Sequence, residues 1–471
     1  MTHDIPSELD RLRTTLRGTL LTAADPGWDA ARAPWNLSVD QHPRAIVTPS
    51  DVEDVRAVLT TARTTGLAVT VQPHGHGAAD ALDDVILVRP TRFDELSIDV
   101  GARMARVGAG VDWGRVLAAL DGTGLVALAG SNPEVSVVGY SLAGGHSGFS
   151  RAFGLASNAV QAIELVTADG TLTRVDAVSD PDLFWALRGG GGLFGIVTAM
   201  EFRLFPLPST EGLLYGGKLT FPGAAARAVL AAMSEVVPHL PDEVSVAGGM
   251  VHLPDAAFVP EPLRGTTLAS VDVISLLDRD ITERLIEPVR TAGDAIADTI
   301  GSFPVGRLPE VAAEPVAPVA AIDHGLLLRT IEPAAIDALV DGFDRGIPLG
   351  LSLLQIRPLG GAIARGSSSD GVAGRVGGAA LVGVSVVGAG PGMDRDRAAR
   401  AINAVLEPVR DFEGRGIVAT FLSAGDDLGR AYDTAAIARL RTVKDRVDPD
   451  GMMRSNRMLP REGEPADDGE G

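Results

Sequence analysis

Two histidines, His74 and His76, stand two positions apart at the end of a β-like run, where residues of this type could do chemistry. The run Leu67–Val71 is rich in β-branched residues, and it leads into a loop that contains Gly75 and Gly77. Glycines let the main chain approach a ligand closely because no Cβ intervenes, and successive backbone N–H groups in a tight loop can hold an anion. The sequence therefore predicts an anion-binding loop with an imidazole beside the bound group.

A metal site is the competing interpretation of the His-x-His spacing. No third ligand lies near His74 and His76 in the sequence, and the 471 residues include no cysteine. The absence of cysteine also excludes disulfides, thiolate metal sites and cysteine nucleophiles. We therefore expect no metal at this loop.

A second glycine-rich element spans residues 130–147. So many glycines cannot form regular helix or strand throughout, and two interpretations remain open: a long surface loop, or a backbone wall against a flat ligand. Val135, Val137, Val138 and Leu142 are too apolar for a solvated loop, which favours the backbone wall.

A third element, residues 182–198, is a helical turn that ends in four glycines before a strand resumes. It is not a P-loop, because no Lys-Ser or Lys-Thr pair follows the glycines. It is also not the dinucleotide fingerprint, in which the glycines follow a strand. The four glycines of this element must therefore have a role other than in either of these two nucleotide-binding motifs.

The elements that position these loops form two blocks. From about Pro43 to Pro206, short strands alternate with helices, as in α+β or α/β units. Predicted here are a helix from Val52 capped by Ser50 or Asp51, strands at 85–88, 96–100 and 104–108, and a helix over 113–120 capped by Asp112.

The second block, from about Pro208 to Ser423, has longer strands. Strands are predicted at 213–220, 244–252, 268–276, 325–331 and 351–357, and helices at 224–237, 281–291 and 395–409. This pattern indicates one large sheet with helices on one face. The Pro-rich stretch 304–318 is predicted to be a long connecting loop, and a final helix over 433–447 ends at the sequence Asp-Pro-Asp-Gly.

Composition excludes several classes of partner. The net charge is −20, so we expect neither nucleic acid nor an anionic membrane surface to attract this chain. The N-terminus lacks the pattern of a signal peptide, and no apolar run approaches the roughly 18 residues that a membrane span needs. We expect a cytoplasmic enzyme, monomeric or homodimeric, that acts on a small molecule.

The glycine elements together resemble the flavin-binding framework of the vanillyl-alcohol oxidase and p-cresol methylhydroxylase (PCMH) superfamily, in its berberine-bridge-enzyme-like branch. The motifs are Gly-His at 75–76, Leu-Ala-Gly-Gly-x-Ser at 142–147, Phe-Trp-Ala-Leu-Arg followed by four glycines at 184–192, and Asp-Pro-Asp at 448–450 ahead of Asn456. Their order is what makes the resemblance specific, and it extends from Trp35 to Leu459.

The resemblance implies an α+β fold with a PCMH-type FAD-binding domain at 32–207 and a substrate-binding domain at 208–425, built on a large antiparallel sheet covered by helices. A C-terminal segment at 426–460 would return to the FAD domain, and the acidic, Gly-rich tail 461–471 is expected to be disordered.

The resemblance also implies the residues that bind FAD. His76 would bond covalently to the flavin, the loop before it would bind the pyrophosphate, and Gly130 would leave room for O₂ beside the flavin. The residues expected to contact FAD are Gln72, Pro73, His74, Gly75, His76, Gly77, Gly130, Ser131, Gly139, Tyr140, Gly144, Gly145, Ser147, Ile196 and Asn456.

Two positions depart from the family near the flavin. Many relatives attach the flavin a second time through a cysteine, where this chain has Asn132, so FAD should be attached through His76 only. His74 stands where relatives usually carry a small residue and is interpreted as a packing or hydrogen-bonding substitution. His146, at a variable position, could be structural or could contact the ligand.

A third departure concerns catalysis. Relatives often place a catalytic tyrosine in a Tyr-x-Asn strand before the final helix, but Val418 and Thr420 occupy those places here. Oxidation of an alcohol needs a base within hydrogen-bond reach of the hydroxyl. The candidates on the predicted substrate sheet are His252, His324, Gln355 and Arg357, with Arg329 as a further possibility.

The sequence thus indicates an FAD-dependent oxidoreductase, an oxidase that passes two electrons from an alcohol, sugar or secondary metabolite to O₂ and forms H₂O₂. Two alternatives stay open. One is a flavin-dependent oxygenase or dehydrogenase with an atypical active site, and the other is a flavin-binding protein without turnover.

Overall fold

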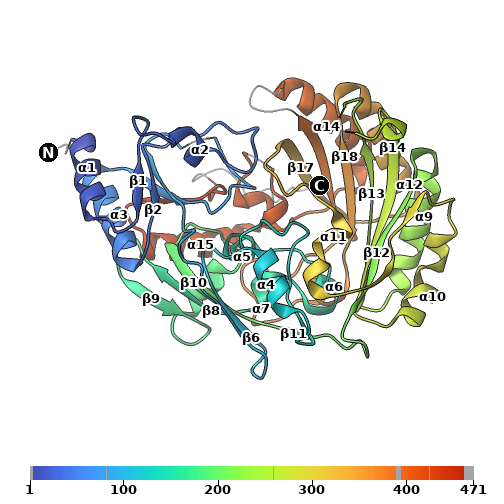
Figure 1. Ribbon diagram of the computed structural model, residues 1–471, viewed down its shortest axis with the longest axis horizontal. Helices are drawn as coiled ribbons and strands as arrows, with labels where there is room; N and C mark the ends of the chain where they lie inside the picture. Colours follow the sequence, from blue (N-terminus) through green and yellow to red (C-terminus); the bar gives the residue numbers. More distant parts are fainter. Residues whose placement is uncertain (1–3, 81, 258, 389–393, 424, 461–471) are drawn as a thin grey trace.

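Two sheet-containing halves lie side by side in the computed structural model, which describes residues 4–80, 82–257, 259–388, 394–423 and 425–460 (Figure 1). The half nearer the N-terminus holds two five-stranded sheets. The other half is one large sheet with helices on its outer face. The tail 461–471, predicted to be disordered, lies outside the described residues.

The first sheet carries the His-Gly-His loop at the end of one of its strands. Its order is β1 (Thr19–Leu21), β2 (Ala45–Thr48), β4 (Val85–Val88), β3 (Ala68–Val71) and β20 (Met453–Arg454). All neighbours are parallel except β1 and β2. The C-terminal segment therefore returns to this sheet, since β20 pairs with β3.

The helix α3 (Val52–Thr65) packs against this sheet, with Val55, Val58 and Leu59 fully buried. Asp51 caps it as predicted, because its carboxylate accepts a hydrogen bond from the Asp54 N–H. Burial of one apolar stripe and a satisfied N-terminus together explain why this segment is helical.

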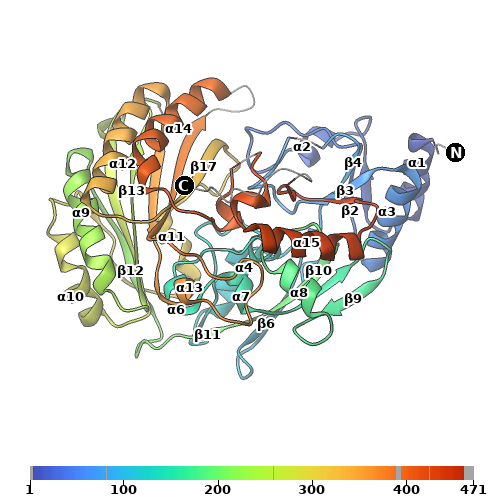
Figure 2. The same cartoon turned by 180° about the vertical axis from the view of Figure 1, so that it is seen from behind.

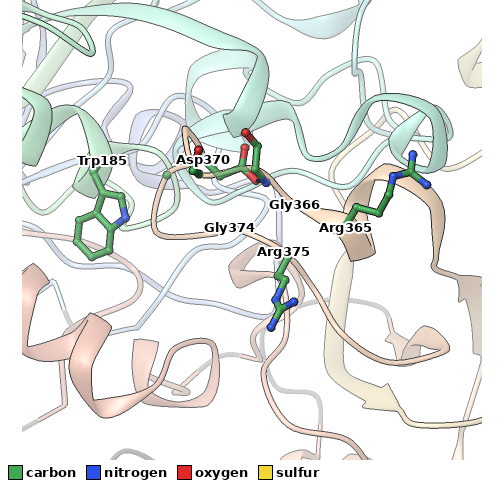
Figure 3. Close-up of a pocket in the computed structure, with 9 residues that line it drawn as sticks. Trp185, Arg365, Gly366, Asp370, Gly374 and Arg375 are labelled. Atoms are coloured by element: carbon green, nitrogen blue, oxygen red, sulfur yellow. Dashed lines mark hydrogen bonds between the residues drawn. The ribbon is translucent and has the colours of Figure 1, made fainter.

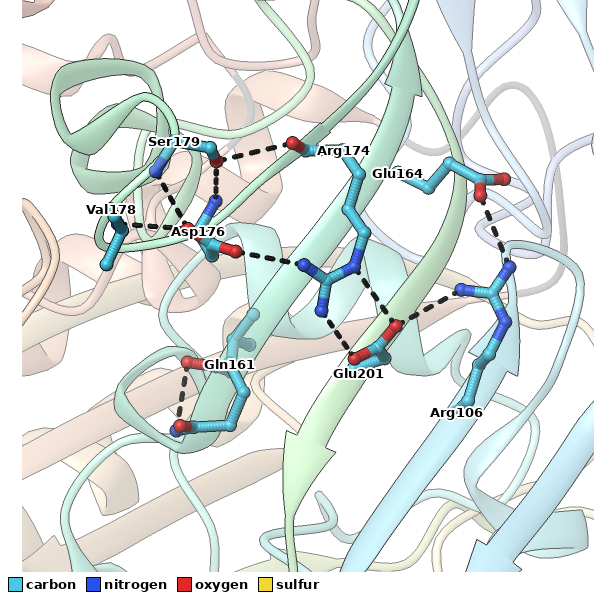
Figure 4. A network of polar contacts seen from close by, with 9 residues as sticks. Arg106, Gln161, Glu164, Arg174, Asp176, Val178, Ser179 and Glu201 are labelled. Atoms are coloured by element: carbon cyan, nitrogen blue, oxygen red, sulfur yellow. Dashed lines mark hydrogen bonds and ion pairs between the residues drawn. The ribbon is translucent and has the colours of Figure 1, made fainter.

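The second sheet is antiparallel and divides an apolar core from solvent. Its order is β5 (Leu96–Asp99), β6 (Met104–Gly108), β10 (Ile196–Arg203), β8 (Val160–Val166) and β9 (Leu172–Val175). On its outer face Glu201 bridges Arg106 and Arg174, and Glu164 also contacts Arg106 (Figure 4). These partly exposed pairs add little stability, so packing on the inner face holds this sheet.

The large sheet fills the second half and is antiparallel throughout. Its order is β15 (Ala297–Asp298), β12 (Leu214–Pro222), β14 (Thr267–Ser275), β13 (Val244–His252), β18 (Leu353–Pro358), β19 (Ala380–Gly388) and β17 (Ala320–Leu328), with β16 (Gly301–Phe303) also paired to β12. Its outer face is covered by α9 (Ala226–Val236), α10 (Arg279–Arg290), α12 (Pro333–Gly346) and α14 (Arg395–Val409) (Figure 2). The prediction of an α+β fold with a large helix-covered antiparallel sheet is confirmed.

Side chains alternate across this sheet, so each strand presents a second face away from the helices. Val271, Leu354 and Val382 belong to the core beneath the helices. Asp272, Gln355 and other polar residues stand on the opposite face, which is turned toward the half nearer the N-terminus.

The strand β17 was placed wrongly by sequence. It spans Ala320–Leu328 rather than 325–331, and it pairs with β19 along its whole length. Asp323 and His324 hide its start in the sequence, because charged and polar residues in succession interrupt the expected alternation. Arg329, beyond its end, donates to the carbonyls of Asp411 and Glu413.

The Pro-rich connection is partly helical, contrary to the predicted loop. It contains η4 (Val305–Arg307) and α11 (Pro309–Ala312), and residues 314–321 then cross to the half nearer the N-terminus. The short helix α11 begins with proline, which suits the first helical turn because its missing N–H would have no partner there.

Other helices and short strands connect and flank the sheets. They are α1 (Ile5–Thr15), α2 (Trp28–Arg32), α4 (Trp113–Leu120), β7 (Leu125–Val126), α5 (Val137–Leu142), α6 (Ser150–Phe153), α7 (Ala156–Ala159), α8 (Pro181–Leu187), β11 (Phe205–Pro206), α13 (Gly361–Arg365) and α15 (Thr434–Val447). Within the part of the chain that the structure describes, no helix is both long and apolar enough to cross a membrane.

Candidate functional site: a flavin cradle facing a polar sheet

The His76 imidazole lies at the centre of the predicted anion-binding loop. Its ring stacks on Trp35 with 4.2 Å between centroids and 15° between planes. Its Nε2 is buried without a hydrogen-bond partner among the described residues. Burial, reinforced by the nearby His74, lowers the pKa of His76 to about 4. The ring is therefore neutral at physiological pH, and its nitrogen lone pair can act as a nucleophile.

The loop is shaped by Gly75, whose φ of +90° few other residues adopt. A Cβ at this position would also lie 2.8 Å from Cβ of Pro34. On the outer side of the loop, Trp35 N–H donates to the His74 carbonyl at 2.8 Å. Asn456, predicted to contact FAD, donates through Nδ2 to the Gly77 carbonyl at 2.7 Å, so the C-terminal segment supports the loop.

Arg89 holds the start of the loop from within the protein. Its guanidinium donates to the carbonyls of Gln72 and Pro73, and also to those of Ala31 and Ala33. The side chain is 9% exposed, and burial lowers its pKa to about 10, so it stays charged. A positive charge beneath this loop also favours an anion on the other side.

Replacing Arg89 by lysine should loosen this loop. An ammonium group cannot reach four carbonyls in the fork geometry of a guanidinium, and buried carbonyls left without a donor cost about 1–3 kcal/mol each. We expect R89K to lower the melting temperature and the flavin content of purified protein. Arg92, which donates to Ser50 at the surface, provides the control: R92K should change neither. Equal flavin content and stability in R89K would contradict this role.

His74 is held by a carboxylate. Its Nε2 lies 2.6 Å from Asp112 Oδ1. Asp112 occupies the N-cap position of α4, as predicted, but its side chain makes no capping bond and binds His74 instead. Among the described residues, no group of three or more histidine, cysteine, aspartate or glutamate side chains could hold a metal ion.

The second glycine element forms a bend at the C-terminal end of α5. Gly144 and Gly145 have φ of +95° and +74°. A Cβ on Gly145 would lie 2.4 Å from the Tyr140 ring, and one on Gly144 would lie 2.9 Å from Val418. Neither glycine can be replaced without moving a neighbour, which explains the run that the sequence shows.

The third element lies against the second. Gly191 N–H donates to the Leu142 carbonyl, and the Tyr432 hydroxyl donates to the Gly189 carbonyl at 2.8 Å. Ile196 follows at the start of β10, opposite Val166 in β8. The C-terminal segment, through Tyr432, therefore also fixes this element.

Several buried polar atoms on these elements have no partner among the described residues. They are His76 Nε2, Tyr140 Oη, His146 Nδ1 and Thr420 Oγ1. Burial lowers the pKa of His146 to about 3 and raises the pKa of Tyr140 well above its usual range. Unpartnered buried polar atoms are costly unless a ligand satisfies them. A flat group with polar edges, such as a flavin, fits these atoms and the glycine-lined backbone.

The positions that depart from the family have structural uses here. Asn132 Nδ2 donates to the Pro315 carbonyl at 2.8 Å, and its Oδ1 accepts from the Glu134 N–H. Val418 is buried against Gly144. Residues 416–421 form no strand; Ala419–Phe421 is a 3₁₀ turn, η7.

The loop 72–77 and the two glycine-rich elements, residues 130–147 and 182–198, are called the flavin elements below. Of the predicted catalytic candidates, the structure brings two, Gln355 and Arg357, close to them. Arg357 donates to Gln355 Oε1 at 3.0 Å and to Ser131 Oγ at 3.4 Å. Both stand on the face of β18 that is turned away from the helices.

The two candidate histidines lie elsewhere. His252 Nδ1 lies 3.1 Å from Thr267 Oγ1, on the side of β13 whose other residues pack on the helices. His324 Nδ1 lies 3.0 Å from Ser423 Oγ at the sheet edge. Neither is directed at the flavin elements.

Sequence analysis missed four charged residues near this face. Lys218 and Asp272 form an ion pair across β12 and β14, Glu314 contacts Ser131, and Asp323 accepts a hydrogen bond from Ser385. Burial raises the pKa of Asp272 and of Asp323. Charges inside otherwise apolar strands were a usable signal for Asp272 and Asp323, whereas Glu314 stood among prolines and alanines.

A separate pocket of about 510 Å³ opens between Trp185 of α8 and the loop after α13 (Figure 3). Its walls include Arg365, Asp370 and Arg375. None of the predicted flavin or catalytic residues lines it, so it is distinct from the site described above.

Comparison with known proteins supports this arrangement. Residues 43–176 match the protein family described as an FAD binding domain. The chain is 29% identical over 304 residues to (R)-6-hydroxynicotine oxidase of Paenarthrobacter nicotinovorans, and this match covers 62% of this chain and 65% of that protein. The match thus spans slightly less than two thirds of that relative.

Two solved structures share the fold. 6-Hydroxy-D-nicotine oxidase from Arthrobacter nicotinovorans superposes with a TM-score of 0.79 at 24% identity, covering 93% of this chain and 97% of the other. A single-residue variant of berberine bridge enzyme gives 0.79 at 17% identity, covering 98% and 100%. The chain therefore shares the fold of these flavin oxidases, and residues 43–176 match an FAD binding domain, as the resemblance implied.

Proposed function

From an FAD-binding domain that faces a polar substrate sheet, we propose that this chain is an FAD-dependent oxidase. It removes two electrons from a small organic substrate, an alcohol, a sugar or a secondary metabolite, and passes them to O₂ to form H₂O₂. The observation that carries the proposal is the loop Gln72–Gly77, where a neutral, unpartnered imidazole lies among backbone groups suited to phosphate.

The flavin is attached through His76 alone. Stacking on Trp35 fixes the imidazole ring, and its lowered pKa leaves a nitrogen lone pair free to form the bond. No thiol exists in the chain for a second attachment, and Asn132 is occupied with Pro315.

Other residues of the chain bind FAD and position the substrate. The loop before His76 holds the pyrophosphate, and the glycines of 144–145 and 189–192 let the backbone lie against the flavin. Bound FAD supplies the acceptor for a hydride. The open face of the large sheet, with Gln355 and Arg357, holds the substrate in position, which is where an enzyme of this kind gains most of its rate.

We propose O₂ as the acceptor because residue 130, which the resemblance places beside the flavin, is a glycine and carries no side chain. A Cβ at this position would lie 3.0 Å from the Tyr140 ring, so a larger residue here would press on that ring. The comparison with an (R)-6-hydroxynicotine oxidase supports oxidase chemistry on small organic molecules.

The test is anaerobic mixing of the yellow protein with panels of alcohols, sugars and polyketides, followed by readmission of O₂. An oxidase bleaches with its substrate, then recovers its colour while releasing one H₂O₂ per flavin. Bleaching that only a dye reverses would identify a dehydrogenase, oxygen insertion into the product would identify an oxygenase, and no bleaching with any compound would indicate a flavin-binding protein without turnover.

The pKa of His76 predicts how attachment depends on pH. An ordinary histidine has a pKa of about 6.5, whereas the pKa of His76 is about 4 in the folded chain. We expect the rate of covalent FAD incorporation into apoprotein to stay nearly constant from about pH 7.5 down to about pH 5.5 and to fall toward pH 4. Between pH 6.5 and 4 the unfolded chain binds more protons than the folded chain, so the apoprotein also loses stability as the pH falls through this window.

Acid-stable flavin measured against time at each pH checks this expectation. Thermal unfolding of apoprotein over the same pH range gives the second reading, with H76A as the variant in which this part of the pH dependence is absent. An incorporation rate that halves near pH 6.5 would contradict the lowered pKa.

A further inference from the structure

Glu314 projects from the connection between the two halves into the region between the flavin loop and the sheet. The Ser131 hydroxyl donates to its Oε1 at 2.7 Å, and Arg357 lies 3.5 Å from the same atom. Ser131 follows Gly130, the residue expected beside the flavin, and Arg357 stands on the open face of the sheet. One carboxylate therefore contacts both walls of the site.

The two oxygens of this carboxylate have different surroundings. Both contacts reach Oε1, and no partner of Oε2 is recorded within the described residues. The side chain is 27% exposed, so molecules from solvent can reach it. A partly exposed carboxylate that is held through one oxygen can accept a proton at the other, as a general base does.

The surroundings of Glu314 are suited to a ligand. The Tyr140 hydroxyl is buried without a partner among the described residues, and the charges of Glu314 and Arg357 both act on it. On the sheet, Gly383 lies opposite Gln355, and a Cβ at Gly383 would meet no other atom within 4 Å. Beside the carboxylate there is thus an unsatisfied polar group and an uncrowded strip of sheet.

Other ionisable groups near the sheet are less suited to the same task. Asp272 is paired with Lys218. Asp323, on the edge strand β17, accepts a hydrogen bond from Ser385 of β19. Neither has a recorded contact with the flavin elements, which Glu314 makes through Ser131.

We propose that Glu314 is the base that accepts the substrate proton in the oxidation. It takes the role of the catalytic tyrosine of relatives, whose position Val418 occupies in this chain. This role rests on the oxidase function proposed above. The hydroxyl proton of the substrate passes to Glu314 Oε2, the adjacent C–H bond breaks with its electron pair leaving as hydride, and a carbonyl forms. Overall, a carbinol and O₂ become a carbonyl compound and H₂O₂, and Glu314 returns its proton during the second half of the cycle. Ser131 and Arg357 are positioning residues that hold Oε1.

The experiment uses the flavin-loaded protein and the panel compound that bleaches it fastest. E314Q should slow anaerobic flavin bleaching by about 10²- to 10⁴-fold, the usual contribution of a general base. The Kd for the same compound, read from perturbation of the flavin absorption, should stay within about twofold, because the lost interaction acts only in the transition state. In E314A, added formate should restore part of the rate, since it supplies a carboxylate in the space left by the side chain.

Glu310 provides a matched control four residues earlier. Glu310 lies on α11, is exposed and pairs with Arg307 of η4. The flavin of E310Q should therefore bleach at the wild-type rate. All variants should keep wild-type flavin content and melting temperature. S131A should show a smaller fall in rate than E314Q, because Arg357 still contacts Oε1.

The remaining outcomes contradict either the role of Glu314 or the oxidase function. Wild-type bleaching rates in both E314Q and E314A remove Glu314 from catalysis. A slow E314A that formate does not rescue, with Kd raised in proportion, makes Glu314 a substrate-binding residue and not the base. A wild-type protein that no panel compound bleaches overturns the oxidase function itself, and the role of Glu314 with it.

Discussion

Replacing His76 by alanine should abolish the covalent attachment of flavin that we propose. Its imidazole is the nucleophile in our proposal because it is stacked on Trp35, neutral, and unpartnered at Nε2 among the described residues. Precipitating the H76A protein with acid should leave all flavin in the supernatant, while the wild-type pellet stays yellow. The glycine-lined backbone remains in the variant, so FAD should still bind reversibly before denaturation.

His74 provides the matched control for this experiment. It is an imidazole two residues away, but Asp112 holds its Nε2 at 2.6 Å. H74A should therefore keep acid-stable flavin. A yellow H76A pellet together with a colourless H74A pellet would reverse the two assignments and contradict this description of the loop.

Replacing Asp448 by alanine should destabilise the protein more than any surface change. Asp448 is 2% exposed, forms an ion pair with Lys444 and accepts the N–H groups of Met452 and Met453. Lys444 in turn donates to the carbonyls of Leu193 and Met453. This pair joins α15 to β20 and to the third glycine element.

Removing one partner of a buried ion pair leaves the other charge uncompensated and costs about 3–5 kcal/mol. Burial already lowers the pKa of Lys444, and Asp448 is what keeps its charge favourable. Denaturant unfolding should show this loss for D448A, with reduced flavin content because the C-terminal segment supports the cradle. Asp450, exposed two residues later, is the control, and D450A should cost about 0.5 kcal/mol or less. Equal losses in the two variants would contradict the role of the pair.

Local sequence signals predicted much of the fold. Helices such as Trp113–Leu120 and Arg395–Val409 carry a strong apolar stripe and occur where they were expected. Strand β13, Val244–His252, also has the predicted bounds. In each case burial of one face, which the residue pattern records directly, decides the structure.

The errors arose where distant residues decide the structure. β17 begins five residues earlier than predicted because pairing with β19 extends it through Asp323 and His324. The side chain of Asp112 was predicted to cap α4, but it contacts His74 instead, 38 residues away in the chain. Such contacts depend on tertiary arrangement, and no local pattern reports them.

The flavin elements and the catalytic residues differ in the same way. Glycines with positive φ and a His-Gly-His loop are contiguous motifs, so the sequence alone could propose a flavin-binding site. The base depends on Glu314, Ser131 and Arg357, which come from three distant segments. With one sequence, candidates on the predicted strands could be proposed, but Glu314 lay in a stretch that resembled a plain connection.

The most direct test of the central claim is a peptide map of the native protein after denaturation. Trypsin cuts after Arg63 and Arg92, since Pro90 blocks the site at Arg89, and this yields a peptide of residues 64–92 that contains both loop histidines. We predict that this peptide carries one FAD and that its fragment ions place the FAD on His76. Flavin on any other peptide, or a protein purified colourless despite ample riboflavin, would contradict this prediction.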